Sequence, residues 1–312
     1  MFSYIIRRVW QMVPTLLGVM LLLFVLYNLV GGDPTYILAG KSLSAEKLAS
    51  IRAELGLDKS QLEQFWVFVK QVVTMDFGTS WSTEQPVSSI INMRIGPTIM
   101  LMLSWQILSL FFSMIFAASV AYFNRSAYDR AVTVFSTVAM SISVLVYIIA
   151  GQYFLAYKMQ WFPVFGWSDS FWENLLIYIP LPLLIGLAVS IAPDTRFYRS
   201  CFVEEMNHDY VRTARAKGLS EQKIMLKHVM RNALIPIVTS VMASLPYMIT
   251  GSVLMERFFG IPGLGNEILK AVDSSDFPMI KAITVYLVIA VMVFNLLADI
   301  IYKYIDPRVQ LK

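Results

Sequence analysis

Few residues in this chain of 312 residues are suited to catalytic chemistry. Cys201 is the only cysteine, and His208 and His228 are the only histidines. A single cysteine excludes a disulfide within the chain and a CxxC metal site, and two histidines leave little material for a metal centre or a base-driven active site. The apolar segments also hold no Ser–Lys pair and no pair of aspartates. We therefore expect no catalytic residues, no metal site, no cofactor and no enzymatic activity in this chain.

One short segment partly matches a nucleotide-binding motif. Gly40-Lys41-Ser42 has the form of the end of a phosphate-binding loop, but the full pattern requires a glycine five residues before Gly40. Thr35 occupies that position, so the motif is incomplete. The sequence predicts that ATP, if it is used at all, is hydrolysed by a separate protein.

The strongest candidate for a functional site is the polar segment 207–236, with the sequence NHDYVRTARAKGLSEQKIMLKHVMRNALIP. Asp209 can cap a first helix, Gly218 suits the left-handed residue that ends it, and Ser220 can cap a second helix. Ala214 is small enough for another protein to approach the backbone closely. We expect two short helices joined at Gly218, with basic side chains along the first and the second leading into an apolar segment.

Two other functions were weighed for this segment. A helix-turn-helix that binds DNA is disfavoured, because apolar segments flank both ends closely and only one turn is basic. Contact of its Lys and Arg side chains with anionic lipid headgroups is compatible with docking of a protein.

The composition indicates that lipid surrounds the helices that hold this segment. Hydrophobic residues make up 57% of the chain and charged residues 15%, whereas a soluble domain carries roughly a quarter charged residues. A bilayer core of ~30 Å needs about 20 helical residues per crossing. The sequence predicts an all-α polytopic membrane protein with six transmembrane helices, at 9–30, 97–123, 131–157, 175–191, 233–254 and 282–302. Pro180 and Pro182 predict a kink in the fourth.

The charges of the connecting segments predict the orientation. One side would hold the N-terminus, the 124–130 turn, the 192–232 loop and the 303–312 tail, with 15 Lys and Arg against 7 Asp and Glu. The other side has 10 against 13. Because positive charge accumulates on the cytoplasmic side, we expect both termini in the cytoplasm.

The long outer segment 31–96 is predicted to be a helical subdomain that precedes the five-helix core at 97–302. A first helix is expected at Ala45–Leu55, ended by Gly56. Ser60 and Glu63 have the spacing of a capping box for a second. The apolar residues of that second helix are predicted to share one face: Leu62, Phe65, Trp66, Val69, Val72 and Val73. This face would pack on the membrane helices or headgroups, or dock an external partner.

The segment 207–236 resembles the EAA loop of bacterial ABC importer permeases, whose pattern is EAA-x3-G-x9-I-x-LP. Gly218 matches its glycine and Ala214 its second alanine, whereas Arg212, Thr213 and Arg231 depart from the pattern. The runs DYVRTARAKG and RNALIP are instead typical of the B-type permease subunit of dipeptide and oligopeptide importers.

Further short motifs along the chain resemble the same subfamily, in the same order and at similar spacing. They are Gly32-Asp33-Pro34, Leu55-Gly56-Leu57-Asp58, Asp76-Phe77-Gly78-Thr79-Ser80, Arg94 with Pro97-Thr98, Trp161-Phe162-Pro163, Pro262-Gly263-Leu264-Gly265 and Asp306-Pro307-Arg308.

The resemblance implies a type I ABC importer permease fold in a bacterial inner membrane. It also implies partners: a second permease subunit, two cytoplasmic ATPases and an extracytoplasmic substrate-binding protein, with membrane lipid around the chain and no nucleic acid. The residues that would couple this chain to an ATPase are Asp209, Tyr210, Arg212, Thr213, Ala214, Lys217, Gly218 and Leu219.

The resemblance points to short peptides, or a related small solute such as a nickel chelate, as the substrate. The alternative is a carrier that works alone and is driven by an ion or proton gradient. Such a carrier is expected to bury several ionisable groups at mid-membrane depth. The only acid within a predicted span is Asp299, close to the end of the last one and four residues from Lys303.

Overall fold

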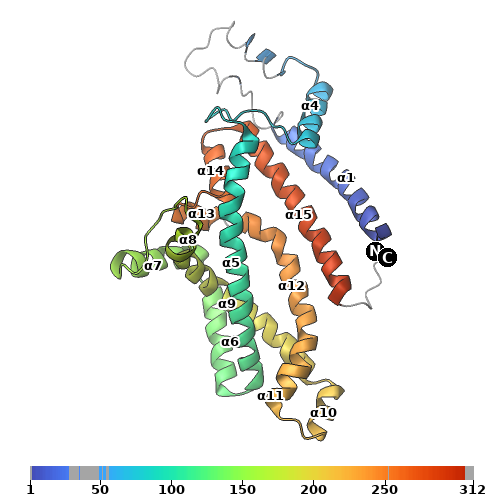
Figure 1. Cartoon of the computed structure of the whole chain (residues 1–312), viewed down its shortest axis with the longest axis vertical. Coiled ribbons are helices and arrows are strands. Elements are labelled where there is room, and N and C mark those ends of the chain that lie inside the picture. Colours follow the sequence, from blue (N-terminus) through green and yellow to red (C-terminus); the bar gives the residue numbers. More distant parts are fainter. Residues whose placement is uncertain are drawn as a thin grey trace. The chain divides into compact units, whose positions relative to one another are not determined.

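The computed structural model describes residues 2–27, 35, 49–50, 52–53, 56–251 and 253–305. The chain divides into two compact units. Among the described residues, unit 1 holds those up to Gly96 and Gly263–Leu296, and unit 2 holds Pro97–Pro262 and those from Leu297. Helices build both units (Figure 1), and the β-structure of these described ranges is one isolated bridge between Thr79 and Pro86. The predicted all-α class is confirmed.

Unit 1 is built from α1 (Phe2–Val25), α4 (Gln61–Thr74), the first turns of α5 (Val87–Tyr122), α14 (Leu264–Asp273) and most of α15 (Phe277–Ile305). Its apolar core joins Leu23 of α1, Phe68 and Val72 of α4, and Ile91 of α5 with side chains from the other two helices. The burial of this core holds the outer subdomain against the helices that follow it in sequence.

The predicted capping box at the start of α4 is present. The hydroxyl of Ser60 accepts a hydrogen bond from the amide of Glu63, and the carboxylate of Glu63 accepts one from the amide of Ser60. Gly56 has a φ of +65°, the left-handed conformation expected of a residue that ends a helix. Most of the predicted helix Ala45–Leu55 lies outside the described residues.

The predicted single apolar face of α4 is wrong in part. Phe68 and Val72 are buried in unit 1. Leu62, Trp66 and Val73 are exposed by 74%, 63% and 76%. The helix is apolar on two sides. Leu62 and Trp66 lie six and two residues before Phe68, and Val73 lies one residue after Val72, spacings that turn these side chains away from the buried face of a helix with 3.6 residues per turn.

Asp276 fastens the outer segment to the start of α15. Its buried carboxylate accepts hydrogen bonds from the hydroxyls of Ser80 and Ser82 and from the amide of Met279. The acid therefore caps α15 and holds the loop before α5 at the same point.

Unit 2 is a longer series of helical segments. They are the rest of α5, α6 (Ala127–Met140), α7 (Val144–Gly151), η2 (Gln152–Lys158), α8 (Phe171–Glu173), η3 (Asn174–Tyr178), α9 (Pro180–Met206), α10 (Asp209–Ala216), α11 (Glu221–Lys223), η4 (Ile224–Val229), α12 (Met230–Gly251) and α13 (Val253–Phe259). The segments labelled η are π-helical turns.

Three helices are long and apolar enough to cross a membrane: Ile5–Val25, Val87–Tyr122 and Phe277–Ile301. Two bent pairs meet the same criterion when each is taken as one span, which gives up to five in the described part of the chain. The predicted fifth segment, 233–254, is mostly covered by α12.

The third predicted span is not one straight helix. Its two halves, Ala127–Met140 and Val144–Lys158, meet at 92°. Ser143 causes the new start, because its backbone is extended and its hydroxyl accepts the amide of Leu145 as an N-cap. The predicted kink of the fourth span is confirmed by a bend of 54° before α9. Pro180 sits at the first turn of α9, where a missing N–H costs nothing.

The fourth predicted span ends too early. It was placed at 175–191, whereas α9 continues unbroken to Met206. Asp194 therefore lies inside this helix and not in a loop. It bonds to Ser109, which is twelve residues after Pro97 and thirteen before the end of α5. The prediction that Asp299 is the only acid within a span stays a prediction, because the end of a helix does not mark the edge of the membrane. The side chain of Lys303, its predicted partner, lies outside the described side chains.

Candidate functional site

The polar segment singled out by the sequence begins where α9 ends. α9 stops at Met206, and α10 begins at Asp209 after His208, whose backbone is extended. Asp209 is thus the first helical residue and not the cap. At the other end Gly218 has a φ of +77° and its amide bonds to the carbonyl oxygen of Arg215. The predicted left-handed glycine is confirmed.

The second predicted helix is divided. Ser220 has the extended backbone of an N-cap, but its hydroxyl accepts no amide. The short α11 continues into the π-turn η4 and then into α12. The chain therefore passes by a helical path from the exposed turn into the core of unit 2, as the sequence predicts.

One face of α10 is packed inside unit 2. Val211 is fully buried and Ala214 is 6% exposed. Both belong to an apolar cluster with Ile224, Met225 and Val229 of η4. Ala214 consequently faces this chain's own η4 and is not part of an exposed surface, so its small size permits close packing within the chain.

Two polar contacts tie α10 to its neighbours. The hydroxyl of Tyr210 donates to a carboxylate oxygen of Glu205 on α9, 2.6 Å away. Burial and this hydrogen bond raise the pKa of Tyr210 to about 12. Arg215 donates from two nitrogens to Glu221 of α11, at 2.7 and 3.2 Å. This pairing raises the pKa of Arg215 and lowers that of Glu221.

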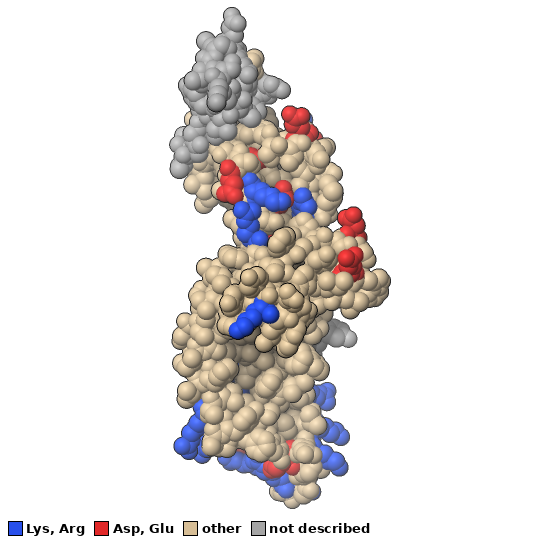
Figure 2. Space-filling model, turned by 90° about the vertical axis from the view of Figure 1, so that its left-hand side faces the viewer, with Lys and Arg blue, Asp and Glu red and all other residues tan. Residues whose placement is uncertain are grey.

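The opposite face of α10 and the turn after it are exposed. The exposed predicted residues are Asp209, Arg212, Thr213, Lys217, Gly218 and Leu219, while Tyr210 is partly buried. Lys and Arg side chains gather at this end of unit 2, and the surface next to it is largely uncharged (Figure 2). The exposed basic residues here include Arg125, Arg130, Arg196, Arg212, Arg215, Lys217, Lys223, Lys227 and Arg231. We call this surface the basic end.

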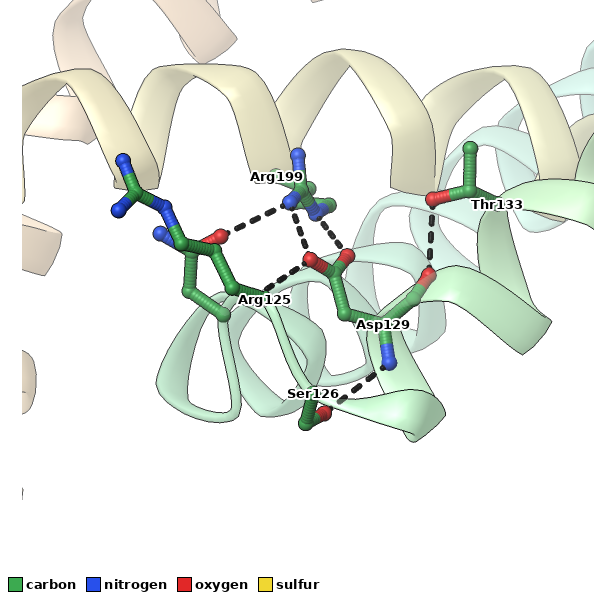
Figure 3. Close-up of polar contacts among 6 residues, drawn as sticks. Arg125, Ser126, Asp129, Thr133 and Arg199 are labelled. Carbon is green, nitrogen blue, oxygen red and sulfur yellow. Dashed lines mark hydrogen bonds and ion pairs between the residues drawn. The ribbon is translucent and has the colours of Figure 1, made fainter.

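An ion pair that sequence reasoning missed braces the basic end (Figure 3). Arg199 of α9 donates from Nε and Nη2 to the two carboxylate oxygens of Asp129, each at 2.6 Å, and from Nη2 to the side-chain oxygen of Asn124 at 3.0 Å. The amide of Arg125 also donates to Asp129, and the hydroxyl of Ser126 caps α6. The pair joins the α5–α6 turn to the helix that leads into α10.

The arrangement offers a surface that another protein could contact. Among the residues that the structure describes, no three His, Cys, Asp or Glu side chains come together in a way that could hold a metal ion. Cys201 is buried. What the site presents is a short exposed helix, held by an apolar cluster, a tyrosine–carboxylate bond and a neighbouring ion pair.

The chain matches two family models over nearly its whole length. Residues 109–311 match the model described as "Binding-protein-dependent transport system inner membrane component", and residues 1–104 match the model of the N-terminal region of such membrane components. The chain is 36% identical to the glutathione transport system permease protein GsiC of Salmonella typhimurium and 34% identical to that of Escherichia coli K12. Each alignment covers 100% of both proteins.

Proposed function

Because this chain belongs to the family of binding-protein-dependent transport system inner membrane components and is a multi-pass inner membrane protein of the ABC importer type, we propose that it forms half of a pathway for short peptides or a related small solute. Its partners in this proposal are a second permease subunit, two ATPases and an extracytoplasmic binding protein. The family's description as binding-protein-dependent supports the last of these.

We place the basic end in the cytoplasm, with six crossings in all. The excess of Lys and Arg on the connections of that side supports this orientation, as does the gathering of basic side chains in Figure 2. In this proposal α12 and the following residues supply the sixth crossing beside the three long helices and two bent pairs.

We propose that α10 and the turn at Gly218 are the part of the chain that an ATPase binds. The observation that carries this is the contrast between the two faces of α10. Val211 and Ala214 fix one face in the apolar cluster, while Arg212, Thr213 and Lys217 are exposed on the other. A helix held on one side and open on the other can receive a partner without unfolding.

Movement of α10 would reach the pathway through its rigid attachments. Tyr210 is bonded to Glu205 on α9, and Arg199 on the same helix is bonded to Asp129 on α6. A displacement of α10 by the ATPases would therefore carry α9 and α6 with it. Nucleotide binding would favour one of two permease conformations because the ATPases bind α10 differently in each.

The relatives named for glutathione transport favour a peptide-like substrate. The choice among such solutes would be made largely by the binding protein that delivers them. This chain would provide the pathway and the mechanical connection.

Reconstitution tests the proposal. Liposomes that contain this chain, a second permease subunit and the ATPases are expected to accumulate a labelled short peptide only when ATP and the binding protein are both present. Accumulation by this chain alone, driven by an ion or proton gradient, would contradict it.

A further inference from the structure

A stripe of polar side chains lies between α5 and α9. Trp105 and Ser109 stand four residues apart on α5, and Ser190 and Asp194 stand four residues apart on α9. Residues at this spacing share one face of a helix. Trp105 packs on Gly186, one further turn back on α9, where a Cβ atom would come within 2.7 Å of the indole ring. We call these residues the α5–α9 stripe.

The stripe forms one chain of hydrogen-bond contacts. The hydroxyl oxygen of Ser190 lies 2.8 Å from the carbonyl oxygen of Gly186 and 2.9 Å from the hydroxyl oxygen of Ser109. The hydroxyl oxygen of Ser109 also lies 2.7 Å from Oδ2 of Asp194. The indole nitrogen of Trp105 donates to Ser190 at 3.0 Å. All four distances are within the range of good hydrogen bonds.

Counting hydrogens fixes the direction of each contact. A carbonyl oxygen only accepts, so Ser190 must donate its single hydroxyl hydrogen to Gly186. Ser190 then has no hydrogen left for Ser109, so Ser109 must donate to Ser190. If Asp194 were ionised, Ser109 would have to share its one hydrogen between Ser190 and Oδ2 of Asp194. If the carboxyl group of Asp194 is protonated and donates to Ser109, each contact has a hydrogen of its own.

The surroundings agree with a neutral acid. Within the described part of the chain, no Lys, Arg or His lies within ion-pair distance of Asp194, and no group donates to its Oδ1. Ser113 follows Ser109 by four residues on α5, and Thr195 follows Asp194 directly on α9. Both are buried, and neither hydroxyl has a hydrogen-bond partner. Asp194 is partly buried. A partly buried carboxylate that has one donor and no cation is disfavoured, and protonation removes that cost.

The nearby ionisable groups are occupied or directed elsewhere. Tyr198 lies one turn beyond Asp194 on α9, and Arg199 is engaged by Asp129 of α6. Arg94 of α5 is partly buried and paired with Glu267. The remaining cations of α9 and of α6, η2, η4 and α12 are exposed: Lys158, Arg130, Arg196, Lys227 and Arg231. His228 is partly buried.

We propose that Asp194 is a proton-binding site, and that its neutral carboxyl group holds α9 against α5 by donating a hydrogen bond to Ser109. The ligand is a single proton, taken up from water while the chain folds into the membrane. The proposal concerns a protonation state and not proton-driven transport, and it does not depend on the ATPase docking proposed above.

Three variants of the full chain in lipid nanodiscs test the site. Asn also donates a hydrogen bond at this position, so Asp194→Asn is expected to unfold within about 2 °C of the wild type, whereas Asp194→Ala, which has no donor, unfolds clearly earlier. The infrared band of a protonated carboxyl group should be present in the wild type and lost in Asp194→Asn. Asp129→Asn is the matched control, because its acid is paired with Arg199, and it should leave that band unchanged.

The dependence of thermal stability on pH provides a second test of the proposal. Since the protonated form is the donor, thermal stability of the wild type should fall at high pH by an amount that Asp194→Asn does not show. Two results would overturn the proposal. One is an infrared spectrum in which Asp194→Asn removes no carboxylic-acid band. The other is an Asn variant as unstable as the Ala variant while Asp194→Glu is stable, which would show that an ionised carboxylate is required.

Discussion

Arg199 of α9 donates two hydrogen bonds, each of 2.6 Å, to the carboxylate of Asp129 of α6. Seventy residues separate the two in sequence. Asp129 is buried and the arginine side chain is 25% exposed, so the pair is only partly screened by water. In our account this contact makes α9, α6 and the basic end move as one body.

Replacing Arg199 with Lys should weaken this brace although the charge is kept. Lysine cannot form the two parallel hydrogen bonds of a guanidinium group. We expect the free energy of unfolding to fall by about 2 kcal/mol. This is less than for a fully buried ion pair, because the side chain of Arg199 is partly exposed. Thermal unfolding in detergent measures it. Arg196→Lys, at an exposed neighbouring position, is the control and should have little effect. Equal unfolding temperatures for both variants would contradict the role of the brace.

Gly218→Val should damage the docking turn without a steric clash. A Cβ atom at this position meets nothing within 4 Å, but the φ of +77° disfavours a branched side chain by about 1–2 kcal/mol. We expect the variant to insert normally and to bind the partner ATPases less tightly in a pull-down. Gly218→Asn is the matched control, because asparagine tolerates the left-handed conformation, and it should bind nearly as well as the wild type. Normal ATPase binding by Gly218→Val would count against the proposed docking site.

Ala214→Trp should disturb the packing between α10 and η4 and not the exposed surface of α10. Overpacking the cluster that contains Val211 and Met225 is expected to cost about 1–3 kcal/mol and to displace α10. Transport should then fall while the protein remains inserted, as measured by peptide uptake and by membrane extraction. Ala216→Trp is the comparison, since Ala216 is exposed. This second variant should keep its thermal stability and lose ATPase binding. Loss of stability in Ala216→Trp and not in Ala214→Trp would show that the two faces of α10 have been assigned wrongly.

The pair of Arg215 and Glu221 predicts a pH dependence. The hydrogen bond from Arg215 lowers the pKa of Glu221 below its ordinary value of 4.5. The contribution of this pair is therefore complete above that value and is lost as the pH falls through the lowered pKa. Because both side chains are exposed by more than 40%, the effect should be small, within about 1 kcal/mol. Acid titration of the wild type against Glu221→Gln, followed by thermal unfolding, measures it. If the unfolding temperatures of the two proteins fall equally with pH, the ion pair of Arg215 and Glu221 does not contribute to stability.

Local features of this chain were predictable from sequence because short spacings determine them. The capping box at Ser60 and Glu63 and the left-handed Gly218 depend on backbone geometry within three or four residues. The bend before Pro180 has a similarly local cause. Each of these appears in the structure as predicted.

Features that depend on the packing of distant segments were missed. Nothing near Asp129 in sequence indicates that Arg199 is its partner. Asp194 was assigned to a loop because hydropathy falls there, although α9 continues for twelve residues beyond it. The burial of Ala214 likewise depends on η4, whose π-turn has no clear sequence signal. A hydropathy pattern reports the average solvent of a segment and not which neighbour each side chain meets.

The most direct test of the central claim is the accessibility of α10. Thr213→Cys, in a chain whose only native cysteine is buried, places one reactive thiol on the exposed face. A reagent that does not cross membranes should label it in inside-out vesicles and not in intact cells, and bound ATPase should protect it. Labelling in intact cells, or labelling that the ATPases do not change, would contradict the account.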